Sequence, residues 1–280
     1  MPKAMLKANT AISLRYDTPE LATTYEEAGI VQFNHGQVLI DQLRIRPGEE
    51  VLDIGAGTGR LAEYVAVLVG PRGRVIGRDP LENRIAIAQS RASDVLTFGV
   101  GRAEDLSEFG DGQFDVVYLN SVFHWIADKS QALREVFRVL KAGGRIGLNT
   151  QDPSKIHESR VLIQAALADA GFEARRAGTH PVLGSDDAAL AALFAEAGFR
   201  GYRSELHAFI DFHDDVDSLL KWSASSSFGN FLVDFSEQER AQIRISLERL
   251  LEAKRTPNGL KLERYLRFAT ASKPNSPGAA

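Results

Sequence analysis

The chain has no cysteine among its 280 residues. Without a thiol it can form no disulfide framework, no cysteine-based zinc site and no cysteine nucleophile. It also lacks a hydrophobic run of membrane-spanning length, and its opening stretch MPKAMLKANTAISLRYD contains no apolar core as long as that of a signal peptide. These features predict a cytoplasmic protein with no membrane partner.

An excess of basic residues is absent as well. The 33 Lys and Arg residues are outnumbered by 37 Asp and Glu residues, which gives a net charge of −4 at pH 7. Because nucleic-acid-binding proteins usually present a basic surface, this balance argues against nucleic acid as a partner. With 44% hydrophobic and 25% charged residues, the chain has the composition of an ordinary globular protein that can bury a sizeable core.

The clearest pattern in the chain is VLDIGAGTGR, residues 51–60. A short apolar run is followed by Gly55, Gly57 and Gly59, and then by apolar residues at helical spacing, so the pattern predicts a strand, a tight turn and a helix. Glycine adopts backbone angles closed to other residues and lets a ligand approach the main chain. The helix start also offers free N–H groups to a negatively charged group.

Two acidic residues accompany this turn. Asp53 stands two residues before Gly55, and Asp79 ends a second predicted strand a little over twenty residues after the turn begins. In a doubly wound sheet a carboxylate at that place can accept hydrogen bonds from both hydroxyls of a ribose. The alternative is a turn aspartate that precedes Pro80. The spacing G-x-G-x-G differs from the dinucleotide fingerprint G-x-G-x-x-G.

This D-x-G-x-G-x-G turn resembles that of class I methyltransferases that depend on S-adenosylmethionine (SAM). Three later stretches resemble the family in the same order: GRAEDL at 101–106, QFDVVYLNSVFHWIAD at 113–128 and EVFRVLKAGGRIGL at 135–148. Within the family, the stretch is similar to the small-molecule branch that includes the ubiquinone/menaquinone-biosynthesis enzymes (type 11). The resemblance covers residues 51–149.

The resemblance implies SAM as cofactor and a small organic molecule as methyl acceptor at O, C or N, with the protein a monomer or a homodimer. It implies that Ala103 and an acidic neighbour, Glu104 or Asp105, lie beside the adenine ring. Asn120 follows the fourth predicted strand, at the sheet edge where α/β proteins bind ligands. The implied cofactor-binding residues are Asp53, Gly55, Ala56, Gly57, Gly59, Asp79, Ala103, Glu104 and Asn120.

The catalytic candidates are His124 and Tyr25. His124 follows the carboxyl end of the fourth strand, and a histidine that titrates near neutrality could act as the base. Tyr16 and Trp125 are candidates for the acceptor pocket, and Tyr16 and Tyr25 for a flap over the cofactor. Each of these four residues has a plain alternative role in packing. No His, Asp and Glu residues stand at a spacing typical of a metal site, and His35 is a weaker candidate for the base.

The predicted fold is α/β: a Rossmann-like, doubly wound and mostly parallel sheet with an antiparallel last strand and helical lid insertions. The predicted parts are an N-terminal helical flap (1–48), the SAM-binding core (49–150), a helical insertion (151–185), the remainder of the core (186–210 and 259–273), a second helical insertion over the acceptor pocket (211–258) and a disordered tail (274–280). Within them, Asp128 is predicted to cap one helix, and Ser236 with Glu239 to form the capping box of another. Residues 141–144 are predicted to be a turn that ends a helix, and residues 263–272 to form the last strand.

Two other functions remain open at this point: a nicotinamide-dependent oxidoreductase, and a non-catalytic SAM-binding protein with a methyltransferase-like fold. Some methyltransferase classes are disfavoured. Asn120 is followed by Ser-Val-Phe rather than by the Pro-Pro-aromatic signature of the amino-methyltransferases that act on adenine and glutamine. The lack of cysteine excludes arsenite and cytosine-C5 methylation by the usual thiol routes.

Overall fold

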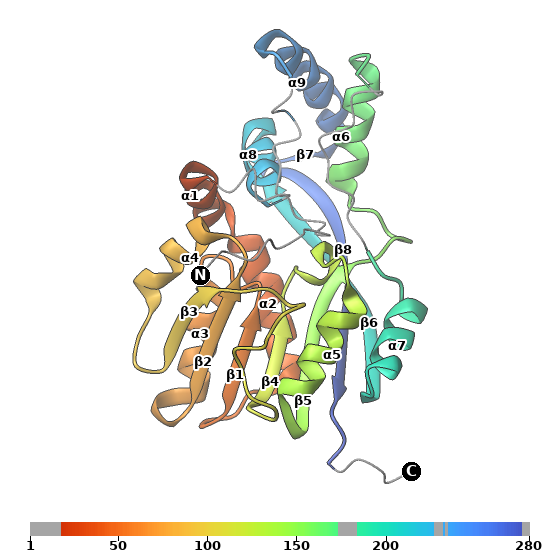
Figure 1. Cartoon of the computed structure of the whole chain (residues 1–280). Coiled ribbons are helices and arrows are strands. Elements are labelled where there is room, and N and C mark those ends of the chain that lie inside the picture. Colours follow the sequence, from red (N-terminus) through yellow and green to blue (C-terminus); the bar gives the residue numbers. More distant parts are fainter. Residues whose placement is uncertain (1–17, 173–183, 227–231, 233–234, 276–280) are drawn as a thin grey trace, which may run out of the picture.

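The structure is a computed structural model that describes residues 18–172, 184–226, 232 and 235–275. Tyr16, the N-terminal part of the predicted flap and residues 276–280 lie outside the described residues. The described residues form a mixed sheet with helices on both faces and a further layer of helices beyond one edge (Figure 1). None of their helices is both long and apolar enough to cross a membrane.

The sheet has the order β3-β2-β1-β4-β5-β8-β6, with β7 paired to β8. Strands β1 to β5 are parallel to one another, and β8 is antiparallel to both β5 and β6. This arrangement confirms the predicted doubly wound sheet with an antiparallel last strand. The strands are β1 (Glu50–Ile54), β2 (Arg74–Asp79), β3 (Leu96–Val100), β4 (Phe114–Leu119), β5 (Leu140–Gln151), β6 (Arg200–His213), β7 (Arg255–Thr256) and β8 (Gly259–Ser272).

Helices cover both faces of the sheet because its strands are apolar on both sides. In β1, Val51 packs with α2, α3 and α4, whereas Leu52 packs with α5 and α7 on the opposite face. The helices are α1 (Pro19–Ala28), α2 (Ile30–Leu43), α3 (Arg60–Val69), α4 (Glu82–Ala88), α5 (Lys129–Val139), α6 (Glu158–Asp169), α7 (Asp187–Glu196), α8 (Val216–Ser226) and α9 (Glu237–Leu251).

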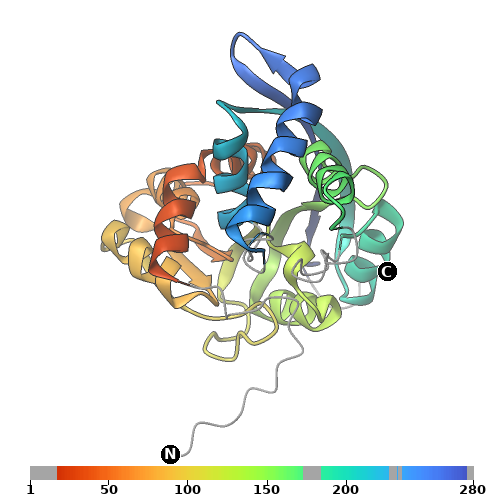
Figure 2. The same ribbon diagram turned by 90° about the horizontal axis from the view of Figure 1, so that it is seen from above.

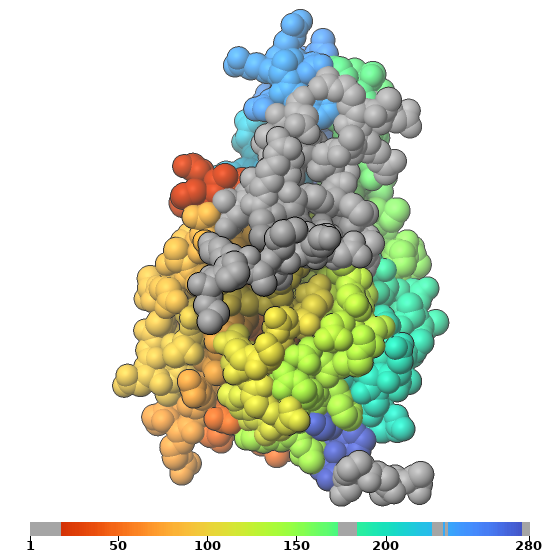
Figure 3. Space-filling view, viewed as in Figure 1, coloured from red at the N-terminus to blue at the C-terminus, as the bar shows by residue number. Residues whose placement is uncertain are grey.

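Helices α6, α8 and α9 form a separate layer, which we call the helical cap. They share a hydrophobic cluster of their own with the first residues of β8, including Leu260 and Leu262. In Figure 1, β8 runs from the body of the sheet up into this cap, and Figure 2 shows α8 and α9 from above. Helix α1 packs against α8, so the N-terminal helices and the cap meet. The space-filling view shows α6 and α9 standing above the α/β body (Figure 3).

Local signals in the sequence explain where several helices begin. The Asp128 side chain accepts from the Gln131 N–H at the start of α5, and Asp186 caps α7 in the same way. Ser236 and Glu239 form the predicted capping box of α9. Each of these caps satisfies N–H groups that a helix start leaves without partners.

Three predicted boundaries were wrong. The turn predicted at residues 141–144 lies inside β5, because α5 already ends at Val139 and the pairing of β5 with β4 shifts register there. Strand β6 continues to His213, beyond the predicted limit at residue 210, and β8 begins at Gly259 rather than at Glu263. The last two strands are longer because they pair with each other along their whole length, out into the cap.

Candidate functional site

The turn between β1 and α3 is packed so tightly that it admits only glycine. Gly55, Gly57 and Gly59 have φ angles of 81°, 56° and 88°, in the left-handed region that side chains disfavour. A Cβ atom on Gly55 would lie 2.0 Å from the Val122 side chain, and one on Gly59 would lie 2.7 Å from Phe98. The sequence prediction of a strand, a glycine turn and a helix is confirmed.

The Asp79 carboxylate lies against this turn. Its Oδ2 accepts from the Gly57 N–H at 2.8 Å, and its Oδ1 accepts from the Leu81 N–H at 3.0 Å. These two bonds fix the carboxylate against the turn. A carboxylate at the end of the second strand of a doubly wound sheet is the group that can accept hydrogen bonds from the vicinal hydroxyls of a ribose.

Asp53 is buried beneath the same turn. The Tyr118 hydroxyl donates to its Oδ2 at 2.7 Å. Burial, and in addition the nearby Asp79 carboxylate, raises the pKa of Asp53 to about 8 even though the tyrosine bond lowers it. Sequence reasoning missed Tyr118. The available signal was the presence of a tyrosine in the buried strand β4, because a buried hydroxyl group needs a hydrogen-bond partner.

A pocket opens beside the turn, between the N-terminal helices and the sheet. Asp53, Gly55, Ala56 and Asn120 line it together with Gln32, whose buried Oε1 has no hydrogen-bond partner among the described residues. A carboxyl group, amide groups and exposed main chain thus converge on one space. This donor and acceptor set fits the amino-acid end of a nucleoside cofactor.

Asn120 is held by its neighbours at the carboxyl end of β4. Its Nδ2 donates to the Gln32 carbonyl at 2.9 Å, and its Oδ1 accepts from the Asn149 Nδ2 at 2.6 Å. Asn149, which sequence reasoning missed, also accepts from the Ser121 N–H at 2.6 Å. Since Ser121 has a φ of 59°, this bond stabilises an unusual backbone conformation directly behind the pocket.

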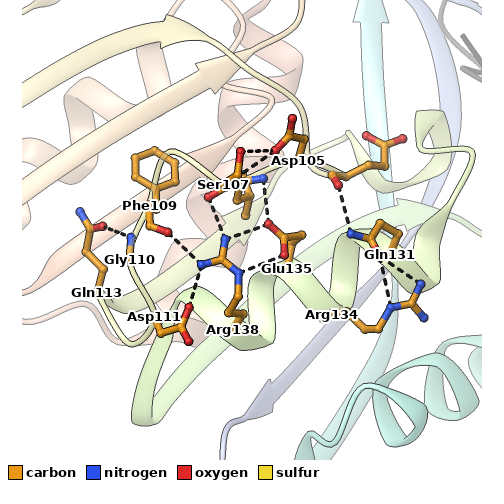
Figure 4. Close-up of polar contacts among 12 residues, drawn as sticks. Asp105, Ser107, Phe109, Gly110, Asp111, Gln113, Gln131, Arg134, Glu135 and Arg138 are labelled. Carbon is orange, nitrogen blue, oxygen red and sulfur yellow. Dashed lines mark hydrogen bonds and ion pairs between the residues drawn. The ribbon is translucent and has the colours of Figure 1, made fainter. Parts of the chain in front are cut away.

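The predicted adenine loop is anchored to α5. Arg138 donates to the carbonyls of Leu106 and Phe109 and to the carboxylates of Glu135 and Asp111 (Figure 4). This guanidinium fixes the loop that follows Ala103, Glu104 and Asp105.

Within that loop the two candidate acids differ in their surroundings. Asp105 is exposed and accepts from both the N–H and the hydroxyl of Ser107, whereas Glu104 is half-buried. Ala103 is buried beside them. The structure therefore favours Glu104 over Asp105 as the candidate for an adenine contact.

Tyr25 projects from α1 onto the glycine turn. Its ring would lie 3.1 Å from a Cβ atom on Gly57, and the Arg84 guanidinium lies 3.8 Å from the ring centroid. Arg84, which the sequence did not indicate, also donates to the Ser225 carbonyl at 2.8 Å and so connects the turn to α8 of the cap. The structure thus places Tyr25 against the glycine turn.

His124 and Trp125 lie in the short helix η4 (Phe123–Trp125) after β4, and both are buried. Burial lowers the pKa of His124 to about 3, with further contributions from Lys129, Arg160 and Arg264. The prediction that His124 titrates near neutrality was therefore wrong: its imidazole is neutral at pH 7. Its Nδ1 has no hydrogen-bond partner among the described residues.

A second set of buried polar side chains lies where β6 and β8 enter the cap. Arg264 pairs through Nε with the Asp211 carboxylate, and its Nη1 donates to His157 Nδ1 at 3.0 Å. Its guanidinium lies 4.3 Å from the Trp222 ring centroid. We call Arg264, Asp211, His157, Trp222, His213 and His35 the cap cluster.

Sequence reasoning considered only His35 of this cluster. The signal for the others was the strand periodicity of two: Asp211 and His213 alternate with outward-facing residues of β6, and Arg264 stands among the inward-facing leucines of β8. No group of three or more His, Asp and Glu residues within the described part of the chain is placed to hold a metal ion.

Comparison with protein families identifies the central part of the chain. Residues 52–148, from β1 to β5, match the family described as a methyltransferase domain. The match includes the glycine turn, Asp79, the loop at 101–106 and the segment that carries Asn120 and His124. Residues 52–148 of the chain therefore form a methyltransferase domain. Its resemblance to the ubiquinone/menaquinone-biosynthesis type is likewise confirmed.

Curated relatives of this methyltransferase domain differ in what their names say they act on. The chain is 32% identical over 209 residues to an arsenite methyltransferase of Aquipseudomonas alcaligenes, an alignment that covers 65% of this chain and 58% of the relative. It is 37% identical over 112 residues to the ubiquinone/menaquinone biosynthesis C-methyltransferase UbiE of Vibrio vulnificus, covering 38% of this chain and 43% of the relative. The chain thus spans about half the length of the curated relatives it matches.

Solved structures share the fold of the methyltransferase domain and its additions. The YcgJ protein from Bacillus subtilis has a TM-score of 0.58 and 22% identity, covering 87% of this chain and 99% of the other. Phosphoethanolamine N-methyltransferase 2 from Haemonchus contortus, solved with SAM, has a TM-score of 0.59 and 18% identity, covering 98% of this chain and 61% of the other. At these identities the likeness establishes the fold alone.

Proposed function

We propose that this protein transfers a methyl group from SAM to O, C or N of a small organic molecule. The observation that carries the proposal is the glycine turn with the Asp79 carboxylate bonded to its main chain, inside the region that matches the methyltransferase domain. A cytoplasmic location and a small-molecule acceptor are part of the same proposal.

The residues around the turn fit this cofactor. Asp79 would accept from the ribose hydroxyls, while Ala103 and Glu104 would contact the adenine ring. Asp53, Asn120 and the unpartnered Gln32 Oε1 line the pocket that suits the amino-acid end. When bound, SAM supplies a methyl group that its sulfonium already activates.

The remaining task of the chain is to align the acceptor with that methyl group and to exclude water. Alignment alone can supply roughly 7–11 kcal/mol of the barrier reduction. We assign Tyr25 and α1 to a flap over the cofactor, and the helical cap to a lid over the acceptor. Trp125 and Tyr16, the latter outside the described residues, remain candidates for the acceptor pocket.

His124 remains our candidate for the base, because its imidazole is neutral at pH 7 and only the neutral form accepts a proton. Its low pKa makes it a weak base, and three nearby cations oppose its protonation. If it is the base, His124→Asn should reduce turnover on the order of a hundredfold while leaving the affinity for SAM unchanged. Turnover equal to that of the wild type would assign His124 to packing.

Calorimetric titration of the full chain with SAM, S-adenosylhomocysteine and NADH tests the cofactor directly. We expect both SAM and its product to bind and NADH to give no heat. Binding of NADH alone would instead support the nicotinamide-dependent oxidoreductase. Tight SAM binding without release of S-adenosylhomocysteine, across a broad screen of acceptors, would support the non-catalytic SAM-binding protein.

A further inference from the structure

The cap cluster places charged groups where leucines would otherwise complete the core. On β8, Arg264 stands between the buried Leu262 and Leu266, and its partner Asp211 is 5% exposed. Replacing a buried ion pair by apolar residues is often neutral or stabilising, so such a pair adds little to the stability of the fold. Buried titratable groups gathered around a charge partner are instead typical of a functional site.

The cluster lies next to three buried polar atoms that have no hydrogen-bond partner among the described residues: Trp222 Nε1, His213 Nε2 and His124 Nδ1. The rings of His213 and Trp222 are 5.7 Å apart, and the Trp222 ring contacts Arg264. An indole N–H can only donate, and burying it unpaired costs about 1–3 kcal/mol. A ligand that relieves this cost must present an atom that accepts a hydrogen bond.

The charges around these atoms disfavour a cation. Arg264, Arg160 and Lys129 act together on His124, whereas the Asp211 carboxylate is already paired with Arg264. Aromatic rings attract ammonium groups, but the Trp222 ring is in contact with the Arg264 guanidinium. An ammonium group would therefore meet the like charge of Arg264, and Asp211, the carboxylate of the cap cluster, already pairs with that guanidinium.

We propose that the cap cluster binds the methyl acceptor and selects molecules with hydroxyl or carboxylate oxygens over those that carry an ammonium group. The oxygens would accept from the Trp222 indole and lie in the field of Arg264. This inference rests on the proposed function, because it names the substrate class of the same site. It assigns the chain an acceptor chemistry different from that of an amine methyltransferase.

The two tryptophans of the chain make the inference testable without turnover. In ¹⁵N-labelled full-length protein, Trp125 and Trp222 give separate indole N–H signals, and Trp222→Phe identifies which is which. The probes are 4-hydroxyphenylacetate, 4-ethylphenol and tyramine, which share a phenol ring but carry an anionic, a neutral and a cationic side chain. Each is titrated with and without saturating S-adenosylhomocysteine.

We expect 4-hydroxyphenylacetate and 4-ethylphenol to shift the Trp222 signal and to bind about tenfold or more tightly than tyramine. Trp222→Phe should weaken the binding of both by roughly 3- to 10-fold, the worth of one hydrogen bond. Tyr202→Phe, which removes a hydroxyl bonded to Asp187 outside the cluster, should leave binding unchanged.

Tyramine binding as tight as that of the oxygen-bearing probes would overturn the inference, and so would a Trp222 signal that none of the probes shifts. Calorimetry of S-adenosylhomocysteine on the same samples separates this inference from the proposed function. If S-adenosylhomocysteine binds but no probe shifts the Trp222 signal, only the proposed acceptor class is wrong. If the probes shift the Trp222 signal but S-adenosylhomocysteine does not bind, the proposed cofactor is wrong and the oxygen-selective site is still supported.

Discussion

At the scale of single residues, the two buried carboxyl groups of the glycine turn have separate tasks. Asp79 is held by two main-chain N–H groups and faces the turn, whereas Asp53 lies beneath the turn and bonds to a tyrosine. Both are buried, and burial raises the pKa of Asp53 to about 8. Substitution by asparagine keeps the shape of each side chain and removes the titratable group, and can therefore tell the two tasks apart.

Asp79→Asn should weaken SAM binding by roughly 10- to 100-fold, because a neutral amide loses the charge-assisted bonds to the ribose. Calorimetry measures the change, and Asp94→Asn, at an exposed position before β3, is the matched control. Unchanged affinity in the Asp79 variant would remove this residue from the cofactor site.

Asp53→Asn should change how stability depends on pH. The folded protein retains the proton of Asp53 up to about pH 8, whereas the unfolded chain releases it near pH 4. The contribution of Asp53 to stability is thus fully present below about pH 4 and is lost as the pH rises through about 8. The Tm of the variant minus that of the wild type should therefore increase between about pH 5 and pH 8; a constant difference would contradict the raised pKa.

At the scale of elements, the two glycines that flank α3 separate backbone strain from function. Gly59 precedes the helix with φ 88°, and Gly70 follows it with φ 64°, so alanine is strained at both positions. A Cβ atom would meet Phe98 at 2.7 Å at Gly59 but nothing within 4 Å at Gly70. The two positions therefore share the strain and differ in what surrounds the added methyl group.

Alanine at either position should cost about 1–3 kcal/mol of stability, measured by urea unfolding. Only Gly59→Ala should also weaken SAM binding, because relief of the clash with Phe98 must move the turn. Equal SAM affinity in the two variants would show that the turn tolerates the displacement.

Sequence reasoning worked well for elements whose signals are local. The glycine turn, the Asp128 cap and the Ser236–Glu239 capping box each lie within a few residues, and each is present in the structure. Sequence reasoning failed where a contact joins two segments that are distant in the chain. Whether Tyr118 reaches Asp53, or Arg84 reaches Ser225, depends on which strands and helices become neighbours, and neither segment carries that information alone.

At the scale of the whole molecule, four buried histidines make the fold sensitive to acid. Burial lowers the pKa of His35 to about 4 and of His124 to about 3, and it also lowers the pKa values of His157 and His213. The unfolded chain binds these protons near pH 6.5, so the stability that the neutral histidines contribute is present above that pH and is lost as the pH falls. The raised pKa of Asp53 has the opposite effect on how stability depends on pH, but it concerns a single group.

His35 and His124 should each contribute a slope that approaches about 1.4 kcal/mol per pH unit below pH 6.5. Urea unfolding at about pH 7, 6 and 5 measures the slope. His124→Gln should reduce the slope by about 1.4 kcal/mol per pH unit, which corresponds to one proton. His207→Gln is the control, because that ring is partly exposed and lies beside Glu205. A wild-type stability that does not change between pH 7 and pH 5 would contradict this account.

The pairing of β6 with β8 extends without interruption from Arg203–Thr270 in the body of the sheet to His213–Leu260 in the cap. One ladder of main-chain hydrogen bonds therefore belongs to two hydrophobic cores. The cap should not detach as a hinged domain, and amide hydrogen exchange along β8 should be slow at both ends. The contact between α1 and α8 carries no such ladder and should therefore open more readily than the pairing of β6 with β8.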